Sequence, residues 1–334
     1  MASSTTTTAP EAVYRQSLGR RLLSIPELGV AVAVIVFFAG FYIADKAMAE
    51  QANFVRMATQ GSMIGLAAFG MSFLMISGEI DLSSGSTAAL GATVAGLLLY
   101  NHGWPELASY GAALGAVAVV GLVNSFIVLK IRMPSFFATL GMSFAVQGLA
   151  VWLLQGQWLY VGDLIPGLTK VVQPSPIFDL PWVFLVLVAL YVIGDILMRT
   201  SKLGATITSV GGNRQAAEIV GINVPLVKTL CFVFTSVCCG MAGILVMAYA
   251  GTTDWSIGDG WLLWVIAIAI IGGGSLRGGV GSVMGALLGT ALIQVIRMGL
   301  ANARVQTNAQ GIVIGVILIG AAILDVIRRK SAQY

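Results

Sequence analysis

"SGEIDLSSGSTAALG" runs from Ser77 to Gly91 and places two carboxylates, Glu79 and Asp81, in a chain otherwise written in Leu, Ala, Val, Ile and Gly. An unpaired charge is costly to bury, so each carboxylate needs a partner, a polar boundary or a function. What surrounds this stretch therefore decides the fold.

The composition is that of an integral membrane protein. Of 334 residues, 57% are hydrophobic and 10% are charged, whereas charged residues make up about 25% of an ordinary soluble domain. The net charge of +4 comes from loop lysines and arginines and indicates no nucleic-acid surface. The three cysteines share one apolar run and the single histidine has no metal-ligand companions, so we predict no catalytic, cofactor or metal site in this chain, and no enzyme.

Apolar runs of membrane-spanning length fill most of the chain and predict an all-α protein of about ten transmembrane helices. The run at 261–273 is shorter than a full crossing and is expected to be extended by glycine-rich flanks or to be partly re-entrant. The predicted spans are 28–45, 56–77, 84–100, 107–129, 134–155, 181–198, 229–250, 261–273, 281–300 and 310–327.

Basic residues predict the orientation. With a cytoplasmic N-terminus, five of the eighteen Lys and Arg lie outside, which leaves thirteen inside. Because positive residues resist translocation, both termini are expected to be cytoplasmic. Residues 1–25 are predicted to be a cytoplasmic, partly disordered segment before a transmembrane domain at 26–330. The five outer residues are Lys46, Arg56, Lys170, Arg297 and Arg304.

The opening stretch belongs to an internal repeat. At an offset of 173 residues the pattern GxxDxSxG occurs twice, as the first motif (residues 78–85) and the second motif (residues 251–258). Five predicted spans lie within this offset, so the second copy must face the opposite side of the membrane, which is typical of transporters. The matched pairs are Gly78 with Gly251, Asp81 with Asp254, Ser83 with Ser256 and Gly85 with Gly258.

Two interpretations of the motifs stay open. In the first, Asp81, Ser83 or Ser84 caps the following helix, Asp254 does the same in the second copy, and the glycines permit a tight break. In the second, the breaks belong to a gate on the translocation path. Capping explains Glu79 less well, because Thr252 takes its place in the second copy.

A polar cytoplasmic loop, about 200–228, carries a short predicted helix. Asn213 is a good N-cap, "RQAAEIV" supplies two turns, Gly221 is placed to end them and Pro225 blocks continuation. So short a helix needs something to dock on: a cytoplasmic protein, or in the alternative the membrane surface. No phosphate-binding GxxxxGK[ST] loop occurs in the chain, so any ATPase must be a separate protein.

The sequence resembles the permease subunits of ribose-type, carbohydrate-uptake ABC importers over nearly its whole length. The matching stretches are "GEIDLSSGS" (78–86), "MPSFFATLGM" (133–142), "GGNRQAAEIVGINV" (211–224) and "IAIIGGGSLRGGVGSVMGALLG" (268–289). The resemblance implies the ABC importer permease fold, here as inverted five-helix repeats. The family usually has Gly where this chain has Glu79, so the first break is more charged here than in relatives.

The resemblance also implies partners and a location. A second permease subunit completes a homodimer or heterodimer, two cytoplasmic ATPase subunits bind ATP and Mg, and an extracytoplasmic solute-binding protein delivers the solute, all at a bacterial inner membrane. The loop at 211–224 becomes the coupling helix. The residues implied in coupling to the ATPase are Gly211, Gly212, Asn213, Arg214, Glu218 and Gly221.

We expect the chain to carry a monosaccharide, a pentose or hexose, by alternating access. A nucleoside or branched-chain amino-acid ABC permease stays open, as does an ion-coupled carrier that uses Glu79 and Asp81. Polar residues inside the spans are candidates for lining the pathway, or else for bonding neighbouring helices. These residues are Ser72, Asn124, Ser143, Gln147 and Gln294.

Overall fold

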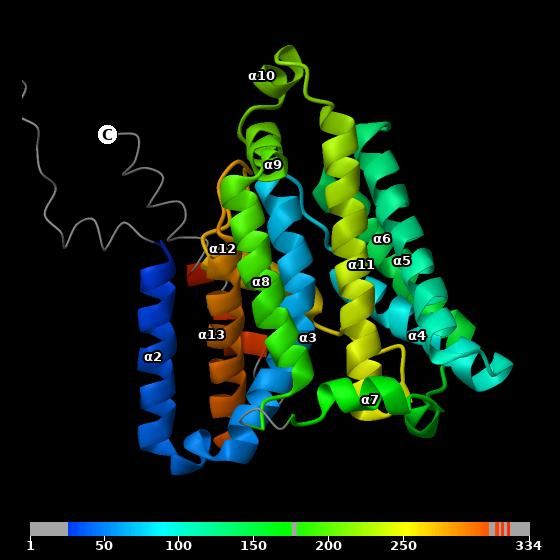
Figure 1. The fold of residues 1–334 in the computed structure, drawn as a ribbon, viewed down its shortest axis with the longest axis vertical. Helices are drawn as coiled ribbons and strands as arrows, with labels where there is room; N and C mark the ends of the chain where they lie inside the picture. Colours follow the sequence, from blue (N-terminus) through cyan, green and yellow to red (C-terminus); the bar gives the residue numbers. More distant parts are fainter. Residues whose placement is uncertain (1–25, 176–178, 307–310, 314, 317–318, 321–334) are drawn as a thin grey trace, which may run out of the picture.

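A computed structural model describes residues 26–175, 179–306, 311–313, 315–316 and 319–320. The predicted N-terminal segment 1–25 and most of the predicted span 310–327 lie outside these residues. The described part is almost entirely helical (Figure 1). Its membrane-sized helices are α2 (Pro26–Ala44), α3 (Gln51–Ile76), α4 (Ser84–His102), α5 (Glu106–Leu129), α6 (Ser135–Leu154), α8 (Trp182–Thr200), α11 (Val224–Ala250) and α13 (Val283–Asn302).

Shorter elements connect these helices. A β-ladder of two residues pairs β1 with β2, Leu159 opposite Thr253 and Tyr160 opposite Thr252. The short elements are η1 (Lys46–Ala49), β1 (Leu159–Tyr160), η2 (Gly162–Leu164), α7 (Pro166–Val172), α9 (Lys202–Gly212), α10 (Arg214–Ile219), β2 (Thr252–Thr253) and α12 (Trp261–Ile271).

Seven of the described helices are long and apolar enough to cross a membrane: α2, α3, α5, α6, α8, α11 and α13. The prediction of about ten spans therefore exceeds what the described residues contain. The 84–100 run forms α4, whose first turns are rich in Ser, Thr and Gly. The 261–273 run forms α12, which has only 11 residues and falls short of a full crossing, as its length indicated.

The helices that precede the two motifs, α3 and α11, form the centre of the molecule. Within its most apolar window α3 is 94% buried, against 6% for α2 at the periphery. Large side chains at the core, such as Met71, Phe232 and Met247, come from α3 and α11. These two helices therefore position the motifs that follow them.

The helix bounds agree with the repeat. Adding 173 to the bounds of α3 gives 224–249, and α11 spans Val224–Ala250. In Figure 1, α3 rises toward the end that carries α9 and α10, called the α10 face below, whereas α11 descends from it. The two helices thus run in opposite directions. The predicted five-plus-five arrangement also needs the 310–327 span, which lies largely outside the described residues.

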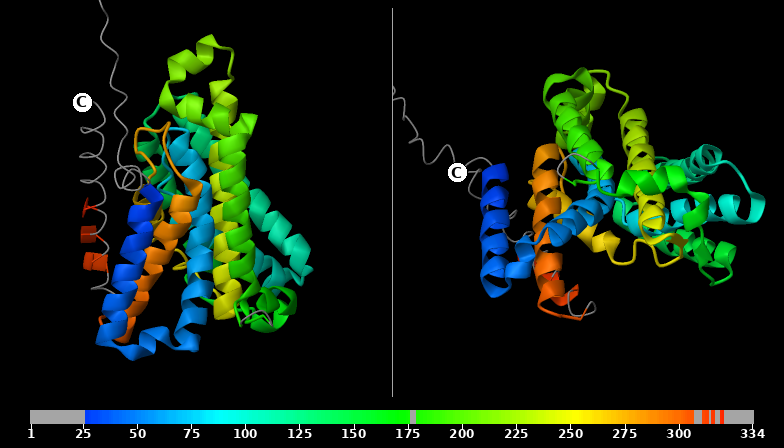
Figure 2. Two further views of the ribbon diagram at one scale, coloured as in Figure 1. Left: turned by 60° about the vertical axis from the view of Figure 1, so that its left-hand side comes forward. Right: turned by 60° about the horizontal axis from the view of Figure 1, so that its bottom comes forward.

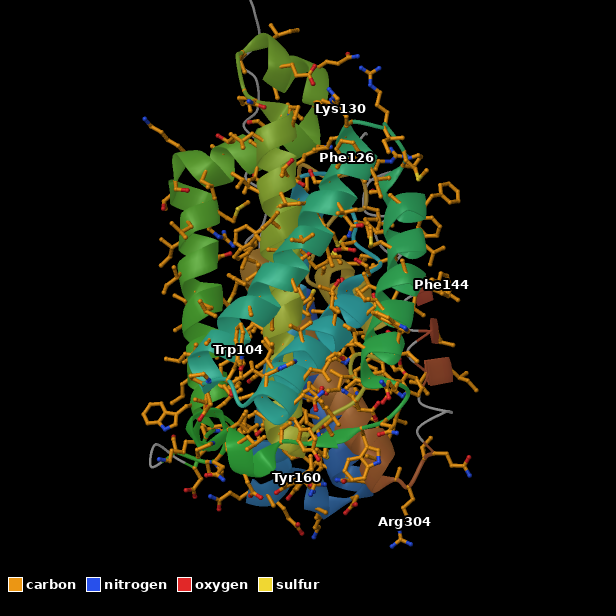
Figure 3. The ribbon with its side chains drawn as sticks, turned by 90° about the vertical axis from the view of Figure 1, so that its right-hand side faces the viewer. Trp104, Phe126, Lys130, Phe144, Tyr160 and Arg304 are labelled. Carbon is orange, nitrogen blue, oxygen red and sulfur yellow. The ribbon has the colours of Figure 1, made fainter. Side chains whose placement is uncertain are left out.

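Figure 3 marks the two ends of the molecule: Lys130 lies at the α10 face, and Tyr160 and Arg304 lie at the opposite face. The two turned views in Figure 2 keep α2 and α13 side by side at one edge of the helices.

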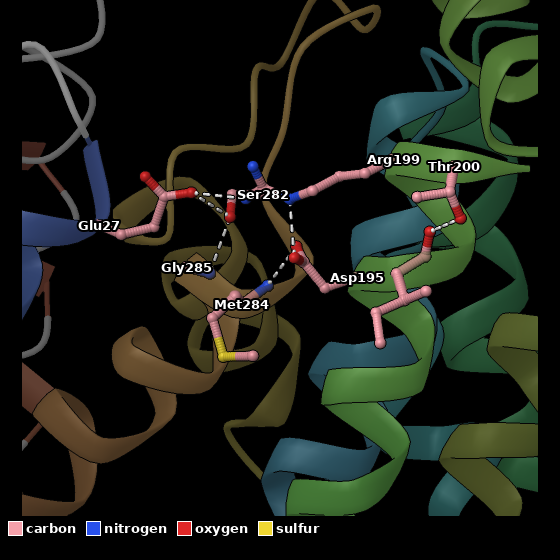
Figure 4. Close-up of polar contacts among 8 residues, drawn as sticks. Glu27, Asp195, Arg199, Thr200, Ser282, Met284 and Gly285 are labelled. Atoms are coloured by element: carbon pink, nitrogen blue, oxygen red, sulfur yellow. Dashed lines mark hydrogen bonds and ion pairs between the residues drawn. The ribbon is translucent and has the colours of Figure 1, made fainter.

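Asp195 with Arg199 and Asp325 with Arg329 are each spaced i,i+4, which predicts two ion pairs. The first pair is confirmed, with 2.7 Å between Asp195 Oδ2 and Arg199 Nε. Arg199 also contacts Glu27 at 3.1 Å, and Glu27 accepts a hydrogen bond from Ser282, the N-cap of α13 (Figure 4). This cluster ties the ends of α2, α8 and α13 together near the α10 face. The analogous predicted pair, Asp325 with Arg329, lies outside the described residues.

Candidate functional site

The first motif is a turn built around the buried carboxylate of Asp81. Its Oδ1 accepts hydrogen bonds from the backbone N–H of Ser83, at 2.8 Å, and from the Ser83 hydroxyl. Asn124 on α5 donates to the Ser83 hydroxyl at 3.0 Å, and Thr139 on α6 accepts from the Leu82 N–H at 2.9 Å. Side chains from two helices, α5 and α6, therefore hold this turn in place.

The capping interpretation of the motifs is wrong in detail. The Asp81 carboxylate accepts from the N–H of Ser83, two residues ahead, and so closes a tight turn. The N-cap residue Ser83 makes no side-chain capping bond to α4. Asp254 likewise accepts from the Ser256 N–H at 2.9 Å, but α12 begins only at Trp261. Both aspartates shape the break itself, because their oxygens are used before the helix starts.

The second motif is less buried than the first, and it is held by segments near the face opposite α10. β1 pairs with β2 beside it, and Gln147 on α6 donates to the Trp255 carbonyl oxygen at 2.7 Å. Burial, and secondly the negative charge of Asp254, raise the pKa of the nearby Asp259 carboxyl above its ordinary value.

The two motifs meet at their last glycines. A Cβ added to Gly85 would overlap the carbonyl oxygen of Gly258, and one added to Gly258 would overlap that of Gly85. Gly258 also has φ of +85°, which side-chain-bearing residues rarely adopt. The matched glycines of the two motifs thus touch backbone to backbone.

Glu79 has a partner that the sequence prediction did not name. Its carboxylate lies 2.6 Å from the ammonium group of Lys228, and the two side chains are only 13% and 8% exposed. Lys228 is the fifth residue of α11, near the α10 face, and was predicted to lie in the loop before a span at 229–250. The sequence signal that could have indicated this ion pair was the position of Lys228 at the edge of an apolar run, because a charge there needs a counter-ion.

The α10 face carries the predicted short helix. The Asn213 side chain accepts from the Ala216 N–H at 3.0 Å, so its N-cap role is confirmed, and Gly221 has φ of +85°. Pro225 lies in the first turn of α11, after α10 has already ended at Ile219, so it begins a helix rather than ending one. Arg214 and Glu218 form an exposed ion pair at 2.9 Å.

The glycines before α10 have a packing role. A Cβ on Gly211 would overlap the Ile76 carbonyl oxygen at the end of α3, and Gly279 donates its N–H to that same oxygen at 2.8 Å. A Cβ on Gly278 would strike the backbone of Gly78. We call Gly78, Gly211, Gly278 and Gly279 the glycine junction. It joins the base of α10 to the start of the first motif.

The five candidate pathway residues do not form one cluster. Asn124 reaches the first motif, Gln147 reaches the second, and Ser143 lies one turn before Gln147 on α6. Ser72 bonds to the carbonyl oxygen of Ala68 in its own helix. Gln294 lies apart from both motifs, where α13 faces α2, α3 and α8.

Substitution of Asp81 separates its local structural role from a role of its charge. Asp81→Asn keeps the oxygen that accepts from Ser83 and should leave the melting temperature close to that of the parent. Asp81→Ala leaves buried donors unpaired and should cost about 1–3 kcal/mol. Thermal unfolding of both variants in detergent checks this, and equal loss in both variants would contradict it. Uptake by folded Asp81→Asn then reports on the charge alone.

Comparison with known proteins identifies the family. The family model described as the branched-chain amino acid transport system / permease component matches residues 53–322. The chain is 29% identical to the xylose transport system permease protein XylH of Haemophilus influenzae, over 90% of this chain and 96% of that protein. It is also 29% identical to the ribose import permease protein RbsC of Bacillus subtilis, over 92% and 93%.

A further relative is the autoinducer 2 import system permease protein LsrC of Yersinia pseudotuberculosis, at 27% identity over 88% of this chain and 83% of that protein. With the membrane-sized helices, these matches make the chain a multi-pass membrane transport protein rather than an enzyme. The chain belongs to the branched-chain amino acid transport system / permease component family, among the permeases of carbohydrate-uptake ABC importers.

Proposed function

We propose that the chain is the membrane subunit of an ABC importer that moves a monosaccharide, a pentose or hexose, inward across the bacterial inner membrane by alternating access. The relatives named for xylose and ribose support the solute class. A nucleoside or a branched-chain amino acid is the second candidate, and the description of the family model favours only the branched-chain amino acid.

One observation carries the proposal: α10 projects beyond the other helices (Figures 1 and 2), and the apolar side chains at its end are exposed. Ile219 is 85% exposed and Val220 is 75% exposed, while Ala217 is buried against Val210 and Val224. A large apolar side chain on a polar loop gains free energy by entering a partner's groove. We assign that groove to a cytoplasmic ATPase subunit, which binds the ATP and Mg that this chain does not.

The remaining parts of the proposal follow from this assignment. The α10 face is then cytoplasmic, and both termini lie on that side. A second permease subunit, identical or different, completes the pathway, and an extracytoplasmic solute-binding protein docks on the opposite face. The residues around the two motifs, Asn124 and Gln147 among them, form the gate.

Glu79 bears on the ion-coupled alternative. A carrier that binds a proton or cation at Glu79 needs that carboxylate to be available, but here it is paired with Lys228 at 2.6 Å. This pairing favours an ATP-driven mechanism over an ion-coupled one.

The direct test is purification of the tagged protein from its native membrane, with identification of co-purifying proteins and an ATPase assay. A stoichiometric ATPase is expected. An ATPase-free protein that still transports solute after reconstitution would overturn the proposal and favour the ion-coupled carrier.

Substitutions on α10 make the test specific. The double variant Ile219→Asp/Val220→Asp should fold normally, because both side chains are exposed, and should lose the co-purifying ATPase. Replacing Arg214 and Glu218 together should keep folding and membrane insertion but uncouple ATP hydrolysis from uptake. Leu107→Asp is the control, since Leu107 is 84% exposed at the start of α5, away from α10. Unchanged coupling in both α10 variants would remove this helix from the mechanism.

A further inference from the structure

An apolar groove runs between α2, α3, α8 and α13, away from both motifs. Its cavity volume is about 500 Å³. Val34 and Phe38 line it from α2, Ala58 from α3, Leu187 from α8, and Leu288 and Val295 from α13. Figure 2 shows α2 beside α13 at this edge of the molecule.

The groove adjoins a second, polar cavity of about 230 Å³. Met57 and Gln294 line both cavities, so the two form one composite groove. Arg56, Gln60 and Arg297 supply polar groups to the second cavity. Arg56 lies near the start of α3 and Arg297 near the end of α13, and both of these helix ends lie at the face opposite α10 (Figure 1).

The polar groups of this second cavity are only partly paired within the described part of the chain, since Arg297 Nη1 donates to Gln294 Oε1 at 3.4 Å. Gln294 is 5% exposed, and its Nε2 has no hydrogen-bond acceptor there. Arg297 Nε is buried without an acceptor, and no carboxylate among the described residues lies within ion-pair distance of Arg297 or Arg56. The Arg297 guanidinium stacks over the Trp264 ring at 4.1 Å. Arg297 is half-buried and Arg56 is exposed. A half-buried guanidinium without a counter-ion is costly, so this geometry favours a bound anion.

We propose that the composite groove binds one anionic phospholipid, with its phosphate on Arg297 and Arg56 and one acyl chain between α2 and α13. Guanidinium groups suit phosphate oxygens, and Gln294 Nε2 is a further free donor. The adjoining apolar cavity favours a lipid over a free anion. The two arginines favour an anionic lipid over a second copy of this chain, since a second copy would bring the same positive charges to its equivalent site.

Native mass spectrometry of the full chain in a neutral detergent tests the headgroup site. Phosphatidylglycerol is titrated against phosphatidylcholine with the same acyl chains, and the anionic lipid is expected to bind more tightly. Arg297→Gln should weaken phosphatidylglycerol binding about tenfold, the loss of one charge-assisted hydrogen-bonding group. Arg304→Gln is the control, because Arg304 is exposed and points away from the helices (Figure 3). Equal binding of both lipids, or no effect of Arg297→Gln, would overturn the proposal.

A second pair of variants tests the acyl groove without touching a charge. Ala39→Phe fills the groove from the exposed side of α2, and Val36→Phe places the same ring on α2 outside the groove. Only Ala39→Phe should reduce lipid binding. Glycerol phosphate that competes as well as the lipid would show that the site takes an anion only and would overturn the lipid assignment. So would subunit dissociation in Arg297→Gln with lipid binding unchanged, which would indicate a second copy in the groove.

Discussion

Glu79→Gln should destabilise the protein by about 3–5 kcal/mol, because it leaves the Lys228 ammonium buried without a counter-ion. The parent ion pair is 2.6 Å long and nearly inaccessible to solvent. Glutamine keeps the shape and loses the charge, so packing changes contribute little. Thermal and denaturant unfolding in detergent measure the loss.

The matched control is Glu218→Gln, which breaks the exposed Arg214–Glu218 pair and should cost at most about 1 kcal/mol. The double variant Glu79→Gln/Lys228→Met should recover most of the stability, since neither charge then remains buried. Equal losses in Glu79→Gln and Glu218→Gln would contradict the buried-pair account. The residue that departs from the family pattern is thus expected to act through its pairing with Lys228.

Gly85→Ala should have the other large effect. Its methyl group would overlap the Gly258 carbonyl oxygen, and a backbone atom cannot rotate away as a side chain can. The two motifs must therefore separate, and we expect a cost of about 1–3 kcal/mol together with loss of uptake. Melting temperature and transport in reconstituted vesicles are the two measurements.

Gly115→Ala on α5 is the control, because an added Cβ there meets no atom within 4 Å. Alanine in a helix is more favourable than glycine, so this variant should be neutral or stabilised by up to about 1 kcal/mol. If Gly85→Ala behaved like Gly115→Ala in both measurements, the Gly85–Gly258 contact would not be needed for stability or uptake.

The sequence predicted well what depends on local composition. Apolar runs located the helices to within a few residues, and the Asn213 cap and the Asp195–Arg199 pair follow from spacing along one helix. The offset of the repeat also predicts that α11 corresponds to α3, because matched motifs need matched helices.

Contacts between segments distant in sequence could not be predicted in the same way. Lys228 lies 149 residues from Glu79, and no periodicity relates the two. Capping by Asp81 was one of two open interpretations, because Asp-Leu-Ser before a helix has that local pattern, but tertiary contacts from Asn124 and Thr139 hold a tighter turn. Gln294 was predicted to line the solute path from its polarity alone; polarity does not specify which neighbours a helix face meets.

In the proposed alternating-access mechanism, the backbone contact between Gly85 and Gly258 acts as a pivot between the two halves. When two halves rock about a common point, each atom moves in proportion to its distance from that point, and a contact made only of backbone has no side chains to repack as it turns. In the proposed mechanism, a displacement of α10 reaches this contact through the glycine junction, where backbone packs against backbone.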